Sequence, residues 1–463
     1  MTTTPDEPMS PVDAAWYHMD GRVNPAIVTG VLVTRTPLDV ARVQQVCRER
    51  LLSFERFRQR VVEHGLPLPV PHWRTLPDFD LDQHLHHVAL PAPHDDEALR
   101  RLVGELASTP LDRRLPLWQW TLVDRVGRGS ALVMRCHHCI GDGGAMMAVA
   151  QRLFDGAALP VHARHAAPPA PPRGLLGWLD GLAGGVTAIV GELLRPDDPA
   201  SPMKGAFGVR QQVAWSRPLA LKDVKRIGAR RAAKVNDVLV ATMTGALRAY
   251  LQRRGHDPRL RTLRAMVPVD LRPPARRGRL GNEFGLVILE LPIGLARRDQ
   301  RLAATQQRMD ALKRSAEPFA MRVLMDLFGR GPKVLEDVAN TLFGSKASVV
   351  FTNVAGPMEP VRFAGAPVER LMFCVPHPGN DLGMGISIMS YAGRVTLLVM
   401  ADAGLVPDPQ AITRLFEREF DALLRTASRP ETRAPGRHTI RRRTGRPPAT
   451  TAGRPRRRGR RAS

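Results

Sequence analysis

Two adjacent histidines, His137 and His138, lie in the stretch Cys136–Gly143, which reads Cys-His-His-Cys-Ile-Gly-Asp-Gly. An imidazole titrates near neutral pH, so it can take up and release a proton under physiological conditions. Asp142 adds a second ionisable group to the same stretch. This stretch is therefore a candidate site for general acid–base chemistry.

The segments on either side of the histidines predict a strand–loop–helix corner. Residues 130–135 are largely apolar and follow the turn-like Gly127-Arg128-Gly129, which predicts a strand paired in a hairpin with residues 121–126. After the histidines, apolar side chains recur at helical spacing over residues 146–153, and Asp142 stands at the N-cap position. Such a corner fixes the direction of the histidine side chains.

Three interpretations of this stretch remain open from the residues alone. The spacing Cys136-x-x-Cys139 is compatible with zinc or dithiol chemistry, but no second ligand pair with that spacing occurs elsewhere in the chain. The histidines are otherwise ordinary buried polar residues next to a capped helix; a second pair, His86-His87, shows that such pairs occur in other contexts. In the third interpretation, one imidazole is a general base that acts directly on an acceptor hydroxyl, since no nucleophile-elbow pattern accompanies it.

Composition indicates a globular protein of two or three domains. The chain has 463 residues with 43% hydrophobic content, and no apolar run approaches the roughly 20 residues that span a bilayer. Residues 1–8 are polar and lack the apolar core of a secretory signal, and four cysteines do not suggest a disulfide framework. We therefore expect a cytoplasmic protein.

The net charge of +24 is unevenly distributed along the chain. Residues 433–463 carry 12 arginines and no acidic residue, which is half of that net charge. A segment so rich in Arg, Pro and Gly cannot bury apolar surface, so we expect a disordered basic tail over residues 429–463. It has no aromatic residue to stack on bases, and no specific nucleic acid partner is expected.

Strands and helices mix in both halves of the chain, which indicates an α/β protein. A Pro-, Ala- and Arg-rich stretch at residues 156–174 predicts the main boundary. We expect a first lobe over residues 1–160, a crossing segment over 161–210 and a second lobe over 211–428. Within the crossing segment, residues 175–194 predict a helix that packs in the protein or lies on a membrane surface.

The expected strands and helices follow from alternation, helical spacing and capping residues. Strands are expected at residues 27–34, 211–215, 264–270, 284–291, 347–352, 369–375, 384–390 and 394–401. Helices are expected to begin near Asp39, Asp95 and Asn236, and to cover residues 298–313, 318–330, 333–343 and 408–424.

His137-His138-Cys139-Ile140-Gly141-Asp142-Gly143 matches the H-H-x-x-x-D-G signature of coenzyme A dependent acyltransferases. From about Met9 to Leu424 the chain resembles the bacterial wax ester synthase/diacylglycerol acyltransferase family. Gly141, Gly144 and Ala355 depart from the residues that are frequent in that family. The motifs that carry the resemblance are Ser10–Ala14, Phe57–Arg60, Asp78–Asp82, Pro110–Arg113, Pro116–Trp118, Asn236–Leu239, Pro268–Arg272, Gly281-Asn282, Thr352–Pro357 and Val406–Asp408.

The resemblance implies a fold of two chloramphenicol acetyltransferase-like lobes, with mixed sheets flanked by helices and a central tunnel between the lobes. It implies an O-acyltransferase that uses acyl-CoA as a substrate, with diacylglycerol or a long-chain alcohol as acceptor, and no metal or cofactor. His138 is then the general base. The alternatives are a related acyltransferase for another hydroxyl or amine, and a catalytically silent lipid-binding protein.

The resemblance also implies roles for the other site residues. Asp142 is expected to hold the loop through an ion pair or cap, and His137 to support the site with its ring turned away. Gly143 is expected to permit the turn. Asn282 is expected to line the reaction centre from the second lobe, with a capped turn as its alternative, and Trp118 to shape or pack the wall of the acyl tunnel.

Finally, the resemblance implies a lipid-facing protein. Lipophilic acceptors partition into membranes, and the excess of arginine favours the phosphates of CoA and an anionic membrane surface. We therefore expect peripheral association with the inner face of the membrane or with lipid droplets.

Overall fold

The computed structural model describes eight stretches of the chain between residues 6 and 428. The helices expected at residues 175–194 and 333–343 and the basic tail at 429–463 lie outside the described residues. The structure describes residues 6–64, 70–156, 196–260, 263–276, 278–315, 317–328, 344–376 and 381–428.

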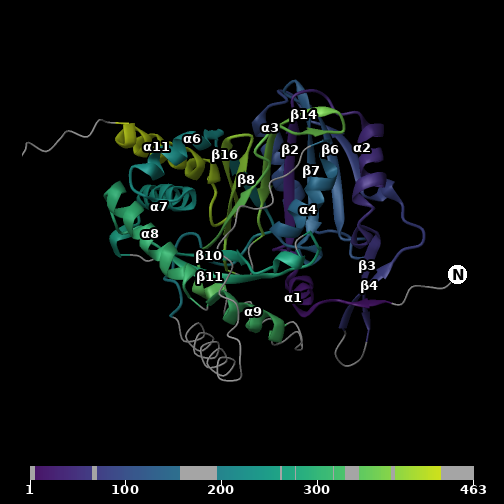
Figure 1. Cartoon of the computed structure of the whole chain (residues 1–463), viewed down its shortest axis with the longest axis horizontal. Helices are drawn as coiled ribbons and strands as arrows, with labels where there is room; N and C mark the ends of the chain where they lie inside the picture. The colour runs from purple at the N-terminus through teal and green to yellow at the C-terminus, as the bar shows by residue number, and fades with distance from the viewer. Residues whose placement is uncertain are drawn as a thin grey trace, which may run out of the picture. The chain divides into compact units, whose positions relative to one another are not determined.

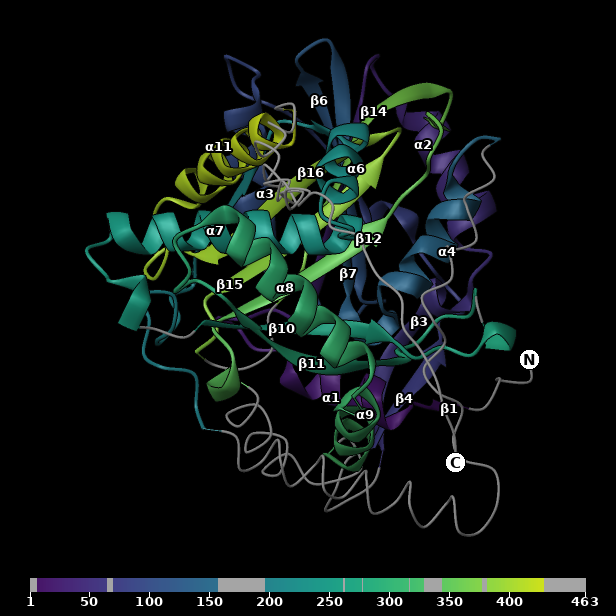
Figure 2. The same cartoon turned by 60° about the vertical axis from the view of Figure 1, so that its left-hand side comes forward.

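Among the described residues, two large mixed sheets form the framework (Figures 1 and 2). The first has six strands in the order β13-β14-β2-β7-β6-β5, and the second has seven, in the order β11-β10-β12-β15-β16-β8, with β9 also paired to β16. A third, small sheet has the order β1-β4-β3. The strands of the first sheet are β2 (Ile27–Thr34), β5 (Leu85–Ala89), β6 (Trp118–Val126), β7 (Gly129–His137), β13 (Arg362–Phe363) and β14 (Ala366–Cys374).

All strands of the second sheet lie between residues 211 and 402. They are β8 (Gln211–Trp215), β9 (Leu219–Ala220), β10 (Leu263–Asp270), β11 (Phe284–Leu291), β12 (Val349–Ala355), β15 (Met384–Tyr391) and β16 (Arg394–Asp402). The small sheet is made of β1 (Glu7–Pro8), β3 (Gln59–His64) and β4 (Val70–Thr75).

Strand β14 leaves the second half of the chain and joins the first sheet. It runs antiparallel to β2, with Cys374 opposite Thr29 and Leu371 opposite Leu32. Figure 1 shows β14 in green beside the purple and blue strands of the first sheet. The predicted lobe boundaries stay a prediction, but membership of the sheets does not follow them at β13 and β14, because strand pairing here is set by contacts distant in sequence.

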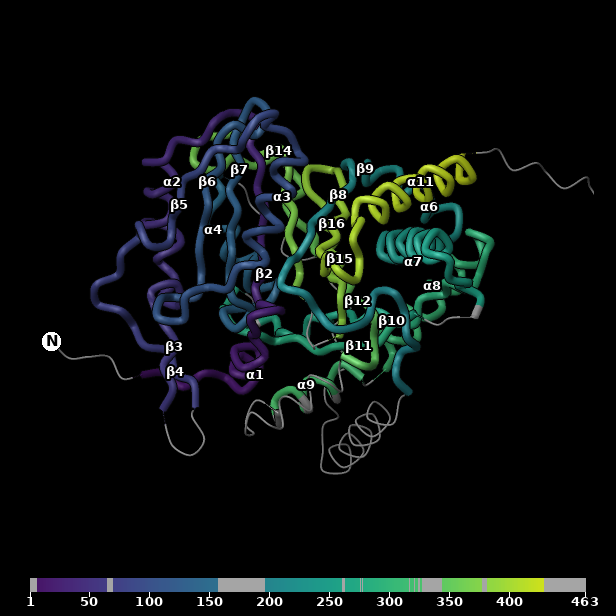
Figure 3. Tube along the Cα trace, turned by 180° about the vertical axis from the view of Figure 1, so that it is seen from behind, coloured from purple at the N-terminus to yellow at the C-terminus, as the bar shows by residue number. Residues whose placement is uncertain are grey.

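The helices cover the sheets and connect them. Helices α6, α7, α8 and α11 lie together on one side of the second sheet (Figures 2 and 3), and their apolar side chains share one buried cluster with its strands. The helices are α1 (Pro11–Met19), α2 (Val40–Val46), α3 (Asp96–Ala107), α4 (Gly143–Leu153), α6 (Leu221–Ala229), α7 (Val235–Arg253), α8 (Arg298–Lys313), α9 (Glu317–Phe328) and α11 (Pro409–Ser428).

Helix α3 joins the two large sheets through a buried apolar cluster. Leu99 and Val103 of α3 pack with Val133 of the first sheet and Trp215 of the second, and Figure 3 shows α3 between β2 and β8. Gly104 allows the close approach, since a Cβ there would lie 3.0 Å from the Gln211 carbonyl oxygen. The lobes therefore share a common core.

Most expected elements are confirmed, and one helix start is wrong. The strand at residues 27–34, the hairpin of β6 and β7, and the N-caps Asp39 and Asp95 are all as predicted. Helix α7, however, is capped at Lys234, and Asn236 lies inside its first turn. The Asp237 carboxylate accepts the Lys234 N–H at 2.8 Å, so the side chain that caps the N-terminus of the helix belongs to its first turn.

Candidate active site

The histidine pair lies at the corner that the sequence predicts. Strand β7 ends at His137, a 3₁₀ turn covers His138–Ile140, and α4 begins at Gly143. Asp142 is the N-cap of α4, and its Oδ1 accepts the Ala145 N–H at 2.9 Å. The corner places His138 between the first sheet and the first turn of a helix.

The His138 imidazole is enclosed by aromatic side chains. It stacks on Trp16 of α1, with ring centroids 3.8 Å apart and an angle of 12° between the planes. The Phe284 ring of β11 lies 5.9 Å from it. Burial lowers the pKa of His138 to about 4, although the negative charge of Asp142 acts in the opposite direction. The ring is therefore neutral at pH 7.

Asn282 determines which nitrogen of His138 carries the proton. Its Nδ2 donates to Asp13 Oδ1 at 2.7 Å and to the His138 carbonyl oxygen at 2.8 Å. The amide oxygen therefore faces His138 Nδ1, at 3.1 Å, and accepts a hydrogen bond from the Nδ1–H group. This leaves Nε2 with a lone pair, and no hydrogen-bond partner for Nε2 is found among the described residues.

The His137 ring is directed to a different set of partners. Its Nδ1 accepts the Cys139 N–H at 3.1 Å, and its Nε2 lies 3.7 Å from Asp20 Oδ1. Burial raises the pKa of Asp20, but the His137 ring and the Arg113 guanidinium outweigh it and bring that pKa to about 2. The His137 ring is thus held by Cys139 and Asp20, whereas the His138 ring contacts Asn282.

Asp142 forms a buried, two-point ion pair with Arg272 from the second half of the chain. The two Nη–Oδ distances are both 2.9 Å, and the side chains are 9% and 2% exposed respectively. Asp142 Oδ2 also accepts the Glu283 N–H at 2.8 Å, while Arg272 donates to the Gly281 carbonyl oxygen at 2.8 Å. Asp142 therefore joins its own loop to the loop that carries Asn282.

The junction between the Asp142 loop and the Asn282 loop requires glycine at Gly281 and Gly144, whereas the sequence predicts this requirement at Gly143. Gly281 has a φ of +98° and pairs with Gly141 across the junction. A Cβ on Gly144 would lie 2.7 Å from Arg272 Nη1. At Gly143 a Cβ would make only an ordinary 3.6 Å contact, and its φ is not positive. The expectation that Gly143 permits the turn is therefore wrong; its contact with substrate stays a prediction.

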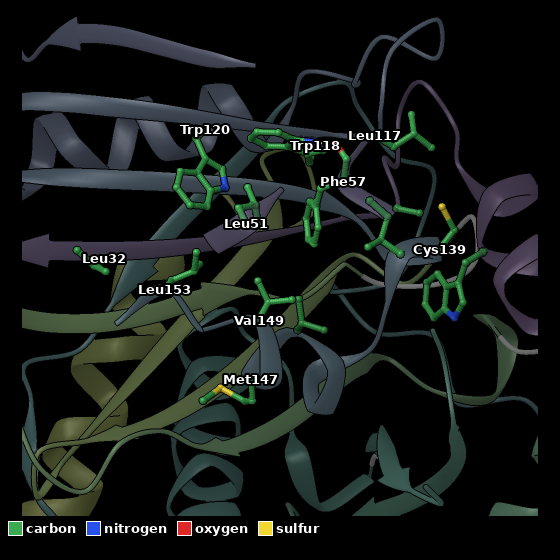
Figure 4. Packing of buried hydrophobic residues seen from close by; sticks show 14 of the residues in the cluster. Leu32, Leu51, Phe57, Leu117, Trp118, Trp120, Cys139, Met147, Val149 and Leu153 are labelled. Carbon is green, nitrogen blue, oxygen red and sulfur yellow. Dashed lines mark hydrogen bonds between the residues drawn. The ribbon is translucent and has the colours of Figure 1, made fainter. Parts of the chain in front are cut away.

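Trp118 lies in the core of the first lobe. Its indole N–H donates to the Phe57 carbonyl oxygen at 2.8 Å, and its ring stacks on His84 with centroids 4.5 Å apart. Figure 4 shows Trp118 beside Phe57 and Leu117. The structure does not bring its ring into contact with His138 in the described part of the chain. A role in an acyl tunnel stays a prediction.

Three residues of the site were not assigned roles from the sequence: Asp13, Trp16 and Arg272. Asp13 and Trp16 lie on α1, and Asp13 is 269 positions from the Asn282 that it contacts. The motifs around Asp13 and Arg272 were noted for their resemblance alone. No local pattern indicates contacts over such separations; the local signals, Ser10 at the N-cap, Pro11 and Asp13 in the first turn, indicate only that a helix begins there.

The cysteines beside the histidines are not paired in a disulfide. Cys136 and Cys139 are both free, and burial raises the pKa of the Cys139 thiol far above its usual value. Within the described ranges, no three His, Cys, Asp or Glu side chains are grouped to hold a metal ion. No described helix is long and apolar enough to cross a bilayer.

Comparison with solved structures gives the class of protein. A wax ester synthase/diacylglycerol acyltransferase from Marinobacter aquaeolei VT8 matches with a TM-score of 0.69 at 22% identity, covering 91% of this chain and 99% of that chain. The first condensation domain of the CDA synthetase matches with a TM-score of 0.60 at 18% identity, covering 93% and 98%. The protein has the two-lobed fold of chloramphenicol acetyltransferase-like enzymes.

Sequence comparison gives the family. Residues 9–196 match the wax ester synthase/diacylglycerol acyltransferase catalytic domain, and residues 280–424 match the WS/DGAT C-terminal domain. A Mycobacterium tuberculosis protein named "Probable diacyglycerol O-acyltransferase tgs1" is 28% identical over 408 residues, which cover 82% of this chain and 87% of that protein. The chain belongs to the wax ester synthase/diacylglycerol acyltransferase family and is an acyltransferase.

Proposed function

We propose that the protein transfers a fatty acyl group from acyl-CoA to the hydroxyl group of diacylglycerol or a long-chain alcohol, with His138 as general base. The observation that carries the proposal is the neutral His138 ring, whose Nδ1–H is held by Asn282 and whose Nε2 lone pair has no partner in the described part of the chain. The names of the family and of its relatives supply the substrate classes.

In the proposed reaction, His138 Nε2 accepts the proton of the acceptor hydroxyl as that oxygen attacks the thioester carbonyl carbon. The carbon–sulfur bond then breaks, and the departing CoA thiolate takes the same proton back from Nε2. Atoms and charge balance without a covalent enzyme intermediate. Positioned general-base catalysis of this kind typically contributes about 10² to 10⁴ in rate.

Asp142 and Arg272 act on the loops and not on the substrate. Both carboxylate oxygens of Asp142 and both Nη atoms of Arg272 are already engaged with each other, with the α4 amide and with the Asn282 loop. They hold the turn that carries His138 against the loop that carries Asn282, and this fixes the distance between the two side chains.

We also propose that the protein works at a lipid surface, at the inner face of the membrane or on lipid droplets. Both acceptor classes are lipophilic, and the chain's net charge of +24 favours an anionic surface. Recovery of the full chain on vesicles of anionic phospholipid, but not of phosphatidylcholine alone, is the expected outcome of a flotation assay. If the protein floated with neither kind of vesicle, this part of the proposal would be contradicted.

The test of the reaction uses purified protein, labelled palmitoyl-CoA, and either dioleoylglycerol or hexadecanol. His138→Ala is expected to lower the rate of ester formation by at least about 100-fold. His87→Ala is the matched control, because His87 is an exposed histidine that also holds one partner, Asp124, at 2.7 Å. Full activity of His138→Ala would refute the general-base role, and CoA release with other acceptors alone would refute the substrate assignment.

A further inference from the structure

Asn282, which contacts His138, also contacts a buried carboxylate, Asp13. Asp13 is 7% exposed, and its Oδ1 accepts two hydrogen bonds from Asn282, from the side-chain Nδ2 at 2.7 Å and from the backbone N–H at 3.0 Å. The chain Asp13–Asn282–His138 thus connects α1 to the imidazole through a single amide group.

We propose that Asp13 is a positioning residue that, through the Asn282 amide, keeps the proton of the neutral His138 ring on Nδ1 and the lone pair on Nε2. This inference rests on the proposed role of His138 as general base. It adds to that role a residue from the first helix of the chain, which touches neither substrate nor the reacting atoms.

The hydrogen-bond directions carry the argument. If the Asn282 amide turned by 180°, its oxygen would face two acceptors, Asp13 Oδ1 and the His138 carbonyl oxygen, and two hydrogen bonds would be lost. Its NH₂ group would then face His138 Nδ1, which would have to become the acceptor and leave the proton on Nε2. The Asp13 carboxylate therefore disfavours the amide orientation that would give the unproductive tautomer.

The cap of helix α1 accounts for only part of the contacts of this carboxylate, which hydrogen-bonds to both Ser10 and Asn282. Helix α1 is already capped by Ser10, whose Oγ accepts the Asp13 N–H at 3.2 Å. Asp13 forms no ion pair with any residue in the described ranges, and burial raises the pKa of its carboxyl group. Burying an ionised group without a counter-charge is costly, and the hydrogen bonds of the Asp13 carboxylate to Ser10 and to Asn282 offset that cost.

The same helix supports the ring from a second direction. Trp16 lies three residues after Asp13, on the same face of α1, and stacks on the imidazole. The stacking fixes the plane of the His138 ring but is indifferent to which nitrogen carries the proton. The Asn282 amide, held by Asp13, selects the nitrogen that carries the proton. Trp16 and Asp13 of α1 therefore have separate effects on His138.

The experiment compares Asp13→Ala, Asp13→Asn and Ser10→Ala in the full-length protein. Protein labelled with ¹⁵N-histidine reports the tautomer by NMR, and the His138→Ala spectrum assigns the His138 signals. Asp13→Ala is expected to move His138 away from the pure Nδ1–H tautomer and to lower kcat by about 10- to 100-fold with KM nearly unchanged. Asp13→Asn keeps an acceptor oxygen and is expected to recover part of that loss.

Ser10→Ala is the control for helix α1, because it removes the cap and the hydrogen bond between Ser10 and Asp13 but leaves both contacts of Asp13 with Asn282. It is expected to keep the Nδ1–H tautomer. If Asp13→Ala does not fold, Asn282→Ala leaves α1 intact and is expected to give the same change of tautomer.

The outcomes separate this inference from the proposed function. An unchanged tautomer and a kcat within twofold of the parent in Asp13→Ala, with His138→Ala inactive, would overturn the role of Asp13 alone. Activity in His138→Ala would overturn the general-base assignment. An equal loss of kcat in Ser10→Ala and Asp13→Ala, with no change of tautomer in either, would reduce Asp13 to a support of helix α1.

Discussion

The ion pair between Asp142 and Arg272 makes a quantitative prediction about the stability of the catalytic corner. In Asp142→Asn, the amide oxygen keeps an acceptor for the Ala145 N–H, so the cap of α4 survives while the negative charge is lost. Arg272, with a side chain only 2% exposed, is left buried without its counter-charge. Removing one partner of such a buried pair costs about 3–5 kcal/mol of unfolding free energy.

The assay is urea denaturation at pH 7, with the slope of the transition checked for each variant. Asp112→Asn is the control, since Asp112 also accepts a backbone N–H and pairs with Arg114, but at an exposed position where the side chains are 38% and 87% accessible. No measurable change is expected there, because solvent screens the pair.

The double variant Asp142→Asn/Arg272→Met isolates the interaction of the two charges. Removing both is expected to cost about 2 kcal/mol less than the sum of the single changes, because neither charge is left alone. Strictly additive losses, or a cost below about 1 kcal/mol for Asp142→Asn, would refute the reasoning that this pair holds the corner together.

Four further outcomes follow from the structure. If the neutral form of His138 is the base, as proposed, kcat/KM is expected to rise as pH increases through about 4, the pKa to which burial lowers the imidazole, and to stay level to pH 7; a limb near 6.5 would contradict this. Trp118→Phe, which removes a buried indole donor, is expected to cost about 1–3 kcal/mol in urea denaturation with kcat unchanged. Gly281→Ala, at a φ of +98°, is expected to lower the unfolding free energy by about 1–3 kcal/mol, and Gly143→Ala by less. Deleting residues 433–463 is expected to leave the rate with soluble substrates unchanged, and a loss in that assay would give the tail a role.

Elements with strong local signals could be predicted from the sequence. The apolar, β-branched run at residues 27–34 predicts a strand from a few adjacent residues. Asp39 and Asp95 predict helix starts in the same way. The predicted start of helix α7 is wrong because asparagine is frequent at N-caps and Asn236 was the nearest candidate. The actual cap is Lys234, whose backbone N–H donates to the Asp237 side chain three residues later. Capping depends on side-chain direction, which composition does not specify.

The order of the strands could not be predicted in the same way. Strand β14 is similar in length and apolar content to β15 and β16, yet it pairs with β2 in the other large sheet. Nothing in its own residues selects that partner, because the register is set by packing against strands more than 300 positions away. Sheet membership is thus a tertiary property, while strand formation is largely local.

The candidate site divides along the same line. His138 and its capped turn were predictable because strand, turn and helix signals are adjacent in the chain. Asn282 was placed near the reaction centre by resemblance alone, and the structure supplies its contact with His138 Nδ1. Asp13 lies in a motif that carries the family resemblance, but the sequence does not predict its role, since its partner Asn282 is 269 positions away.

The contacts at this junction make stability and catalysis difficult to separate. Asn282 lies between Gly281, whose N–H donates to the Ile140 carbonyl oxygen at 3.0 Å, and Glu283, whose N–H donates to Asp142 at 2.8 Å. Any shift of the Asp142 loop therefore moves both neighbours of the amide that orients His138. A hydrogen bond of 3.1 Å tolerates little further lengthening before it weakens steeply. Asp142 makes no hydrogen bond with the His138 ring in the described part of the chain, yet its loss is expected to affect the tautomer of His138 through the backbone on both sides of Asn282.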